Sequence, residues 1–431
     1  MLDTGNTGFM LISAMLVLLM TPGLAFFYGG LSRRKNVVNT MMMSVMVIGV
    51  VAVIWVICGW SLAYGGDADN PNPFIGGFDL FGLGGMVQSM IAGGDISDGT
   101  GWPVLMNVTY QMAFAMITTA IITGSVAGRM KFGAIVTFCC IWVILIYCPL
   151  AHMVWGGGFI GATGVIGALD FAGGDVVHIS SGLTGLVLCL ILGKRKGYGV
   201  MDVRAHNTPF VLLGATLLWF GWFGFNGGSA FAANGQAALA LLNTVVASGA
   251  ASLSWMVCEK VAQGKSTLVG AATGLVAGLV VITPAAGYVE PWAAVVMGII
   301  VSPICYLCIS KLKHKLGYDD ALDAFGCHCI GGITGGICTG LFCVPDLSAH
   351  LAADGTPYGG LLYTGDPTQF LAQLAGIGIT IVFVIVGALV IGFIVKAIFH
   401  GSLRVSEEDE ARGLDVTQHG ESAYPAFLGM D

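Results

Sequence analysis

Long apolar stretches alternate with short polar junctions along almost the whole chain. A helix that crosses the hydrocarbon of a membrane needs roughly 20 mostly apolar residues. Eleven stretches meet this requirement, at residues 10–28, 38–63, 104–127, 132–151, 167–192, 209–231, 237–258, 266–286, 292–309, 322–343 and 370–399. The pattern therefore predicts an all-α polytopic membrane protein with eleven transmembrane helices.

The composition agrees with this prediction. Hydrophobic residues make up 56% of the chain and charged residues only 10%, whereas a soluble domain usually carries about 25% charged residues. The twelve cysteines lie in or near the predicted spans and do not resemble a disulfide framework. The sequence contains no basic patch with interleaved aromatic residues, the pattern that would indicate a nucleic-acid partner.

Positive charge falls on one side of the predicted membrane. If the eleven spans alternate in direction, all 17 lysines and arginines lie at the junctions that follow odd-numbered spans. Because positive residues stay cytoplasmic, we expect the N-terminus outside and the C-terminus in the cytoplasm. The chain then divides into a transmembrane domain, 1–399, and a cytoplasmic C-terminal tail, 400–431.

One motif occurs twice. HISSGLTG begins at His178 in the fifth span, HCIGGITG begins at His328 in the tenth, and both fit H-x-x-x-G-[LI]-T-G. An odd number of spans separates them, so the two helices run in opposite directions. This predicts an inverted repeat of spans 1–5 and 6–10, with halves at 1–196 and 205–343 and residues 370–399 as an eleventh helix. In such folds the site lies near the midplane, at the repeat interface.

The two histidines are candidate pore-lining residues. Polar residues inside spans are costly and usually face a cavity or pathway. At 1.5 Å per residue, His178 lies roughly 16 Å from one face and His328 roughly 9 Å from the other, so the rings approach each other near the midplane. A lone histidine would more simply bond a neighbouring carbonyl. A matched pair of neutral rings, each with a donor and an acceptor, suits proton relay or guidance of a small polar solute.

Aromatic residues gather near the outer ends of the spans. Trp155 lies in the segment AHMVWGGG at the outer end of the fourth span, and Phe114 lies on the third. Trp222 and Phe225 share a face of the sixth, with Ser229 one turn further out. Taken singly, each ring is typical of a core or an interface belt. Together they indicate a cation site, because ring faces attract cations and a serine hydroxyl adds an acceptor.

Two aspartates precede the histidines. Asp170 lies near the outer start of the fifth span, where it either supports a cation from behind the aromatic residues or caps its helix. Asp323 lies near the inner start of the tenth span, where we expect it to act as a cap.

These features together resemble the ammonium transporter family (Amt/Mep/Rh), on its Amt branch. The resemblance covers nearly the whole chain and rests on the segments PGLAFFYGGL, AHMVWGGG, ALDFAGGDVVH, WFGFNGGSA, DAFGCH and RVSEEDEARGLDVTQHGESAY. It implies a transport domain in the cell membrane that recruits ammonium, deprotonates it and conducts ammonia through a narrow hydrophobic pore, with coupled proton transfer as an option. The roles it implies are recruitment by Trp155, Phe114, Ser229 and Asp170, a gate of Phe114 and Phe225, and a pore lined by His178, His328 and Trp222.

The resemblance also implies a homotrimer with one pore per subunit, and a PII-type signal protein that docks on the cytoplasmic face and tail. It implies no cofactor and no metal, and no catalytic triad, metal cluster or nucleotide loop in the sequence favours an enzyme. Two alternatives remain open, an ammonium sensor and a passive Rh-like gas channel. Trp155 and the ALDFAGGD segment favour the Amt branch, and no appended signalling domain precedes Asp431, which favours transport.

Overall fold

The computed structural model describes residues 2–67, 71–93, 101–200 and 204–424. Regular structure within these ranges is helical apart from two isolated β-bridges. Eleven helical segments of this described part of the chain are long and apolar enough to cross a membrane. The predicted fold class is therefore confirmed.

Five spans form the first half. They are α1 (Thr4–Leu31); α2, η2 and α3 (Val37–Ile54, Trp55–Gly59, Trp60–Tyr64); α5 (Val104–Val126); α6, η4 and α7 (Phe132–Trp142, Val143–Tyr147, Cys148–Trp155); and η5 with α8 (Gly174–Ile179, Ser180–Leu192). Short helices η1 (Arg34–Asn36), η3 (Phe81–Leu83) and α4 (Met86–Ile91) lie between them.

Five more spans form the second half and one follows it. They are α9 with η6 (Thr208–Trp222, Phe223–Gly227); α10 (Gly235–Gln263); α11 with η7 (Leu268–Ile282, Thr283–Ala285); α12, η8 and α13 (Pro291–Leu307, Cys308–Leu312, Lys313–Leu316); η9 with α14 (Phe325–Cys329, Ile330–Phe342); and α16 (Thr368–Ile398). The short helices are η10 (Pro345–Leu347), α15 (Leu361–Thr364), α17 (Glu407–Arg412) and α18 (Leu414–His419).

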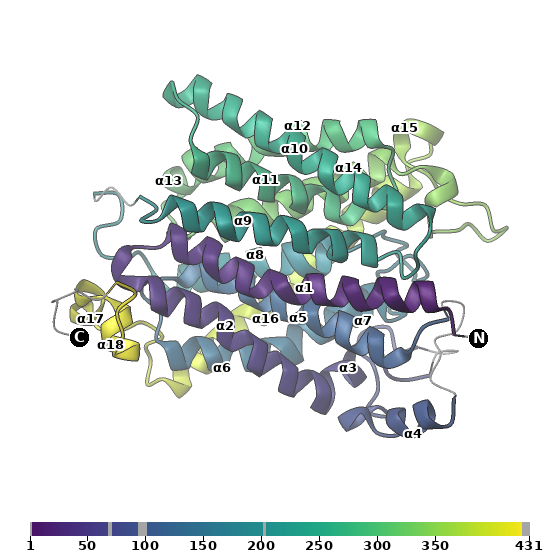
Figure 1. The fold of residues 1–431 in the computed structure, drawn as a ribbon, viewed down its shortest axis with the longest axis horizontal. Coiled ribbons are helices and arrows are strands. Elements are labelled where there is room, and N and C mark those ends of the chain that lie inside the picture. The colour runs from purple at the N-terminus through teal and green to yellow at the C-terminus, as the bar shows by residue number, and fades with distance from the viewer. Residues whose placement is uncertain (1, 68–70, 94–100, 201–203, 425–431) are drawn as a thin grey trace.

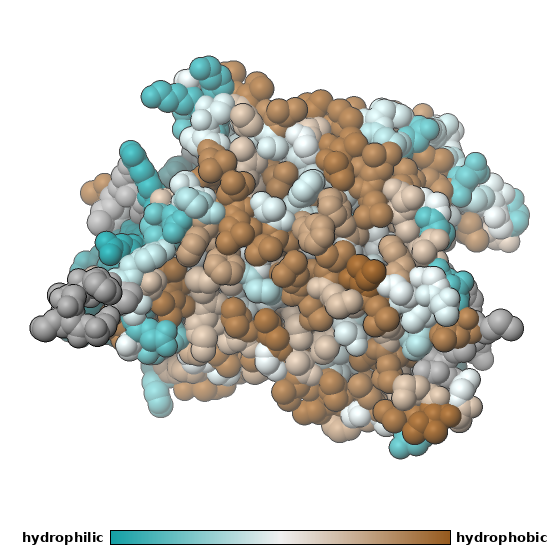
Figure 2. All heavy atoms as spheres, viewed as in Figure 1, coloured by the Kyte–Doolittle hydropathy of each residue, from teal (hydrophilic) through white to brown (hydrophobic). Residues whose placement is uncertain are grey.

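The spans lie side by side along the long axis of the molecule, with the two termini at opposite ends (Figure 1). We call these ends the N face and the tail face. All 17 lysines and arginines lie within the described residues, and the alternating spans place them on the tail face. Hydrophobic side chains cover the middle of the visible surface and hydrophilic ones gather towards both ends (Figure 2), as a lipid-facing belt requires.

The first helices of the two halves, α1 and α9, pack along each other. Glycines permit this close approach: a Cβ on Gly214 would lie 2.1 Å from the backbone nitrogen of Phe27. Close backbone contact through small residues is how helices associate in membranes, where lipid offers no hydrophobic drive between them.

Several spans extend beyond their predicted ends, as the first does to Thr4 and the ninth to Leu316. Three others were predicted three or more residues too long, into a loop. The fifth span begins at Gly174 instead of residue 167, because residues 167–173 form a loop in which Gly167 and Gly173 have φ values of 74° and 127°. The tenth begins its π-helical turn at Phe325 instead of residue 322, after Asp323 with φ 61°. The sixth ends at Gly227 instead of residue 231. Buried loops are as apolar as helices, so the hydrophobic pattern does not mark these ends.

Candidate transport site

The two motif histidines are in contact at the interface between the halves. Their Nδ1 atoms are 3.2 Å apart, and the ring centroids are 5.3 Å apart with an interplanar angle of 24°. His178 is 1% exposed and His328 is 4% exposed. A hydrogen bond between two Nδ1 atoms requires one ring to donate and the other to accept, so a single proton is shared along this contact.

The inverted repeat creates this contact. Each histidine lies in a π-helical turn, η5 or η9, a local widening that is frequent at functional sites. The motif glycine of each half then packs against the histidine segment of the other. A Cβ on Gly182 would lie 2.6 Å from the backbone nitrogen of Cys329, and a Cβ on Gly332 would lie 3.1 Å from the Cβ of His178.

A narrow cavity surrounds the histidine pair. Its volume is about 10 Å³ and its walls include both histidines, Trp222, Phe225 and aliphatic side chains of α1, α5 and α9. The Trp222 ring stacks on His178 at 5.4 Å while its Nε1 donates to the hydroxyl of Thr283 at 2.9 Å. The indole therefore presents an apolar face to the cavity. The Nε2 atom of His178 is buried and has no hydrogen-bond partner among the described residues.

Two stacked phenylalanines separate this cavity from the N face. The rings of Phe114 and Phe225 lie 4.1 Å apart with an interplanar angle of 14°, and both are buried. Phe225 borders the histidine cavity, and Phe114 borders a larger pocket at the N face. A molecule that passes from the pocket to the histidines must displace at least one of these rings.

The N-face pocket has a volume of about 330 Å³. Trp155, Phe114, Ser229 and Asp170, the four residues expected at a recruitment site, all line it. Trp155 meets Phe114 edge-on at 6.0 Å. The hydroxyl of Ser229 donates to the carbonyl of Phe225 at 2.8 Å and lies 3.2 Å from that of Tyr110, so a lone pair on this oxygen remains for another donor.

Two further residues of this pocket were missed by the sequence reasoning. Asn107 and Gln111 of α5 line it, and the buried oxygens Oδ1 and Oε1 of their amides have no hydrogen-bond partner within the described residues. Their spacing on the chain was the available signal, because Asn107, Gln111 and Phe114 share one helix face at i, i+4 and i+7. Free amide oxygens in an aromatic pocket are suitable acceptors for the N–H groups of a cation.

Asp170 caps the helix that carries His178. Its Oδ1 accepts from the backbone nitrogens of Gly173 and Gly174 at 2.8 and 2.6 Å, and its Oδ2 accepts from Asp175 and Val176 at 2.9 and 3.3 Å. The carbonyl of Asp170 accepts from Trp155 Nε1 at 2.9 Å. One residue thus joins the pocket tryptophan to the histidine helix.

The expectation that Asp323 caps the tenth span is wrong. Its carboxylate forms an ion pair with Lys313. The backbone nitrogen of Phe325 instead donates to Asp320 Oδ2 at 2.8 Å. Asp323, Glu259 and His328 line a cavity of about 300 Å³ at the tail face. His328 borders this cavity and the narrow one, so the pockets follow one another from the N face to the tail face.

Comparison with known proteins identifies the family. The model of the Ammonium Transporter Family matches residues 8–424. The ammonium transporter of Aquifex aeolicus is 47% identical over 98% of this chain and 94% of its own length, and that of Bacillus subtilis is 47% identical over 98% and 99%. The chain belongs to the ammonium transporter family. Its relatives are named as transporters and not as enzymes.

Solved structures of ammonium transporters have the same fold. Mep2 of Saccharomyces cerevisiae matches with a TM-score of 0.83 and 34% identity over 94% of this chain and 88% of its own. Mep2 of Candida albicans matches with a TM-score of 0.84 and 32% identity over 98% and 91%. A protein described as a sensor Amt protein matches with a TM-score of 0.84 and 26% identity over 96% and 98%.

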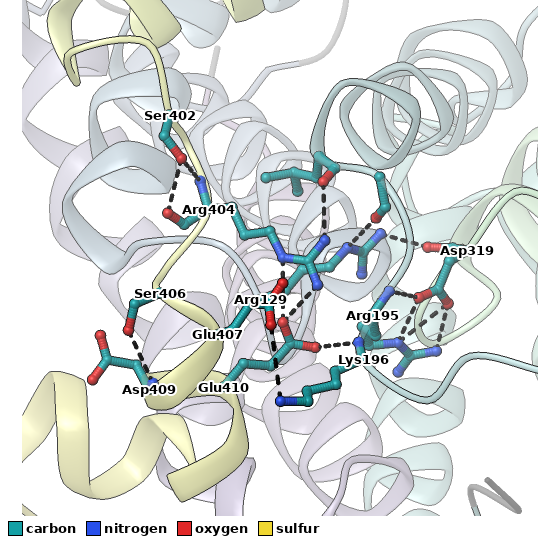
Figure 3. A network of polar contacts seen from close by, with 12 residues as sticks. Arg129, Arg195, Lys196, Asp319, Ser402, Arg404, Ser406, Glu407, Asp409 and Glu410 are labelled. Carbon is teal, nitrogen blue, oxygen red and sulfur yellow. Dashed lines mark hydrogen bonds and ion pairs between the residues drawn. The ribbon is translucent and has the colours of Figure 1, made fainter. Parts of the chain in front are cut away.

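The tail of this ammonium transporter family member is folded against the tail face as far as Tyr424. Arg404 donates to Glu410 Oε2 at 2.6 Å, and Oε1 of the same carboxylate accepts from the backbone nitrogen of Lys196 at 2.6 Å (Figure 3). Further along, the Asp415 carboxylate accepts from the backbone nitrogen of Asn39 at 2.9 Å. The tail thus connects the junction after α8 with the start of α2.

A buried ion cluster lies beneath the tail. Arg195 forms an ion pair with Asp319 at 2.7 Å, and Arg129 donates to the carbonyls of Gly193 and Asp319 (Figure 3). Burial lowers the pKa of Arg129, and although the charge of Asp319 opposes this, the pKa falls to about 10. Burial alone would raise the pKa of Asp319, but hydrogen bonds and charge from Arg195 and Arg129 outweigh it and hold that pKa below its usual value. The cluster fixes the junction to which the tail binds.

Proposed function

We propose that this protein is an ammonium transporter of the cell membrane that recruits ammonium at its N face, removes a proton and conducts ammonia to the tail face. The main support for the proposal is the order of the sites from the N face inwards. A pocket with aromatic faces and free oxygens is followed by a stacked pair of rings and then by a narrow, mostly apolar cavity with two histidines. We take the N face as external and the tail face as cytoplasmic.

The pocket favours a small cation. Trp155 and Phe114 offer ring surface, which attracts cations more strongly when they are desolvated. Ser229, Asn107 and Gln111 offer acceptor oxygens. Ammonium satisfies both features because it carries positive charge and donates N–H bonds. Sodium and potassium carry the charge but donate no hydrogen bond.

Beyond the rings a bare cation is costly. The cavity around the histidines is almost closed, with a volume of about 10 Å³, and it is mostly apolar. Transfer of an isolated charge into such surroundings costs much more free energy than transfer of a neutral molecule. Ammonium that passes Phe114 and Phe225 therefore gives up a proton and continues as ammonia. The free Nε2 of His178 is a suitable acceptor, and the Nδ1–Nδ1 contact leads from it to His328. A coupled proton transfer along the pair follows.

Two other functions compete. An ammonium sensor is favoured by one observation, the likeness to the sensor Amt protein. A passive gas channel would conduct ammonia without moving charge. The narrow cavity is compatible with it, whereas the cation pocket at the N face favours transport of ammonium.

The partners are part of the proposal. We propose that the protein forms a homotrimer with a pore in each subunit. A PII-type signal protein would bind the tail face, where α17 and α18 present an ordered surface.

Purified protein in proteoliposomes tests the function. We expect an ammonium pulse to produce uptake together with a transient current, because charge and ammonia cross by linked routes. Uptake without current would favour the gas channel instead. Ammonium binding with neither uptake nor current would favour the sensor.

A further inference from the structure

Two buried glutamines of α16 have no part in the route described above. Gln369 is 0% exposed and Gln373 is 2% exposed, and their spacing of four residues places them on one helix face. A buried amide inside a membrane span is costly unless its hydrogen bonds are satisfied. The α16 helix also lies outside the two repeats, so the inverted symmetry does not explain these residues.

Gln373 binds both backbone polar groups of Leu169. Its Oε1 accepts from the backbone nitrogen of Leu169 at 2.6 Å, and its Nε2 donates to the carbonyl of Leu169 at 2.8 Å. The same Nε2 lies 3.3 Å from the carbonyl of Gly336 in the second repeat. One side chain thus connects the loop 167–173 with the helix that follows His328.

Gln369 extends this contact. Its Nε2 donates to the carbonyl of Gly167 at 3.2 Å and to Gln373 Oε1 at 3.3 Å. Its Oε1 lies 2.9 Å from His350 Nδ1, which donates because an amide oxygen only accepts. Further along α16, a Cβ on Gly376 would lie 2.8 Å from that of Ala168. The helix therefore lies directly against the loop and leaves no room for it to shift.

The loop determines the geometry of the site. Leu169 immediately precedes Asp170, whose carbonyl binds the Trp155 indole and whose carboxylate caps the helix with His178. A displacement of Leu169 would therefore move the indole in the N-face pocket and the ring in the histidine pair together. Misplacement by about 1 Å is enough to lower the rate of a positioned reaction by about 100-fold.

We propose that Gln369 and Gln373 form an amide clamp that positions the loop 167–173, and through it Trp155 and His178, for ammonium recruitment and deprotonation. They are positioning residues and do not touch the substrate. The role in transport rests on the proposed function, whereas the clamp on the loop does not.

The first test is Gln373→Leu, which keeps much of the side-chain volume and leaves the N–H and C=O of Leu169 unpaired. We expect the KM for ammonium uptake to rise about tenfold or more. Hydrogen–deuterium exchange in a peptide that spans 167–180 should become faster. The matched control is Leu374→Ala, the next residue on α16 with a 40% exposed side chain, which should change neither quantity. Size-exclusion chromatography would check that both variants remain folded and assembled.

The second test is Gln373→Glu, which provides a readout that general destabilisation does not give. A protonated glutamate accepts and donates as the amide does, whereas an ionised one only accepts and faces the carbonyl of Leu169. Its uptake, relative to that of the unmodified protein, should therefore increase as pH falls. This variant also keeps the clamp testable if Gln373→Leu fails to fold.

The outcomes separate the clamp from the function. Unchanged KM and unchanged exchange in Gln373→Leu would overturn the clamp. So would a lower maximal rate that comes with unchanged exchange in 167–180, combined with a ratio of Gln373→Glu uptake to unmodified uptake that does not vary with pH. If the unmodified protein shows no uptake, the proposed function fails, and the exchange measurement alone still decides whether the glutamines hold the loop.

Discussion

Asp170 shows how one buried side chain organises this site. Its carboxylate accepts four backbone N–H groups at the start of the histidine helix, where the helix dipole also favours negative charge. Both oxygens are occupied, so under the proposed function the carboxylate would act on a cation in the pocket through its charge alone, while the backbone carbonyl holds Trp155. Of the two roles that the sequence left open, the structure shows the cap, and the support of a cation stays a prediction.

The variant Asp170→Asn should therefore lower both stability and uptake. An amide keeps one acceptor oxygen and turns an NH₂ group towards two of the backbone donors. Each donor left without a partner costs about 1–3 kcal/mol. Thermal unfolding followed by tryptophan fluorescence would measure the loss. Asp354→Asn is the control, because that aspartate is exposed, and equal unfolding midpoints for the two variants would contradict the role of Asp170.

At the scale of the helices, the interface between the repeats depends on glycine. Gly182 and Gly332 allow each half to lie against the histidine segment of the other, and the π-helical turns direct the two rings towards each other. The separation of the histidines is therefore set by backbone contact and not by the rings themselves.

Gly182→Ala tests this arrangement. The added Cβ would lie 2.6 Å from the backbone nitrogen of Cys329, so the halves must separate. Overpacking of this kind costs about 1–3 kcal/mol, and we expect a lower unfolding temperature together with reduced uptake. Gly249→Ala is the matched control, with no atom within 4 Å of the added Cβ. A Gly182→Ala protein as stable and active as this control would contradict the account.

The elements also show what could be predicted from the sequence. Lipid imposes a length and polarity on each span, so the eleven spans were predictable, and the repeated motif indicated the inverted repeat. The loop 167–173 could not be predicted, because burial makes a loop as apolar as a helix. Only the φ values reveal the break at Gly167. Asn107 and Gln111 were missed because free amide oxygens become evident only when the pocket around them is known.

At the scale of the whole molecule, the tail is the element that joins distant parts of the tail face. It contacts the start of α2, the junction after α8 and the start of α6. The junction after α8 continues the helix that carries His178. The tail is thus connected to the histidine pair through a single helix and the buried ion cluster beneath it.

Glu410→Gln should loosen this contact without disturbing the pore. Glu410 is 2% exposed and pairs with Arg404, so loss of its charge weakens a largely buried ion pair. We expect amide exchange in residues 404–420 to become about tenfold faster or more, because local opening becomes easier, while exchange in α5 and α9 stays unchanged. Glu408→Gln is the control, since Glu408 is exposed. Equal exchange in both variants would show that the ion pair does not hold the tail.

The central claim is that ammonium loses its proton before it passes His178 and His328. The most direct measurement compares ammonium and potassium pulses on proteoliposomes that contain either the unmodified protein or the double variant His178→Ala, His328→Ala. The account predicts an ammonium current without a potassium current for the unmodified protein, and loss of this discrimination for the double variant, because the cavity then lacks the proton acceptor and becomes wide enough for an ion. A double variant that keeps unaltered selectivity for ammonium would contradict it.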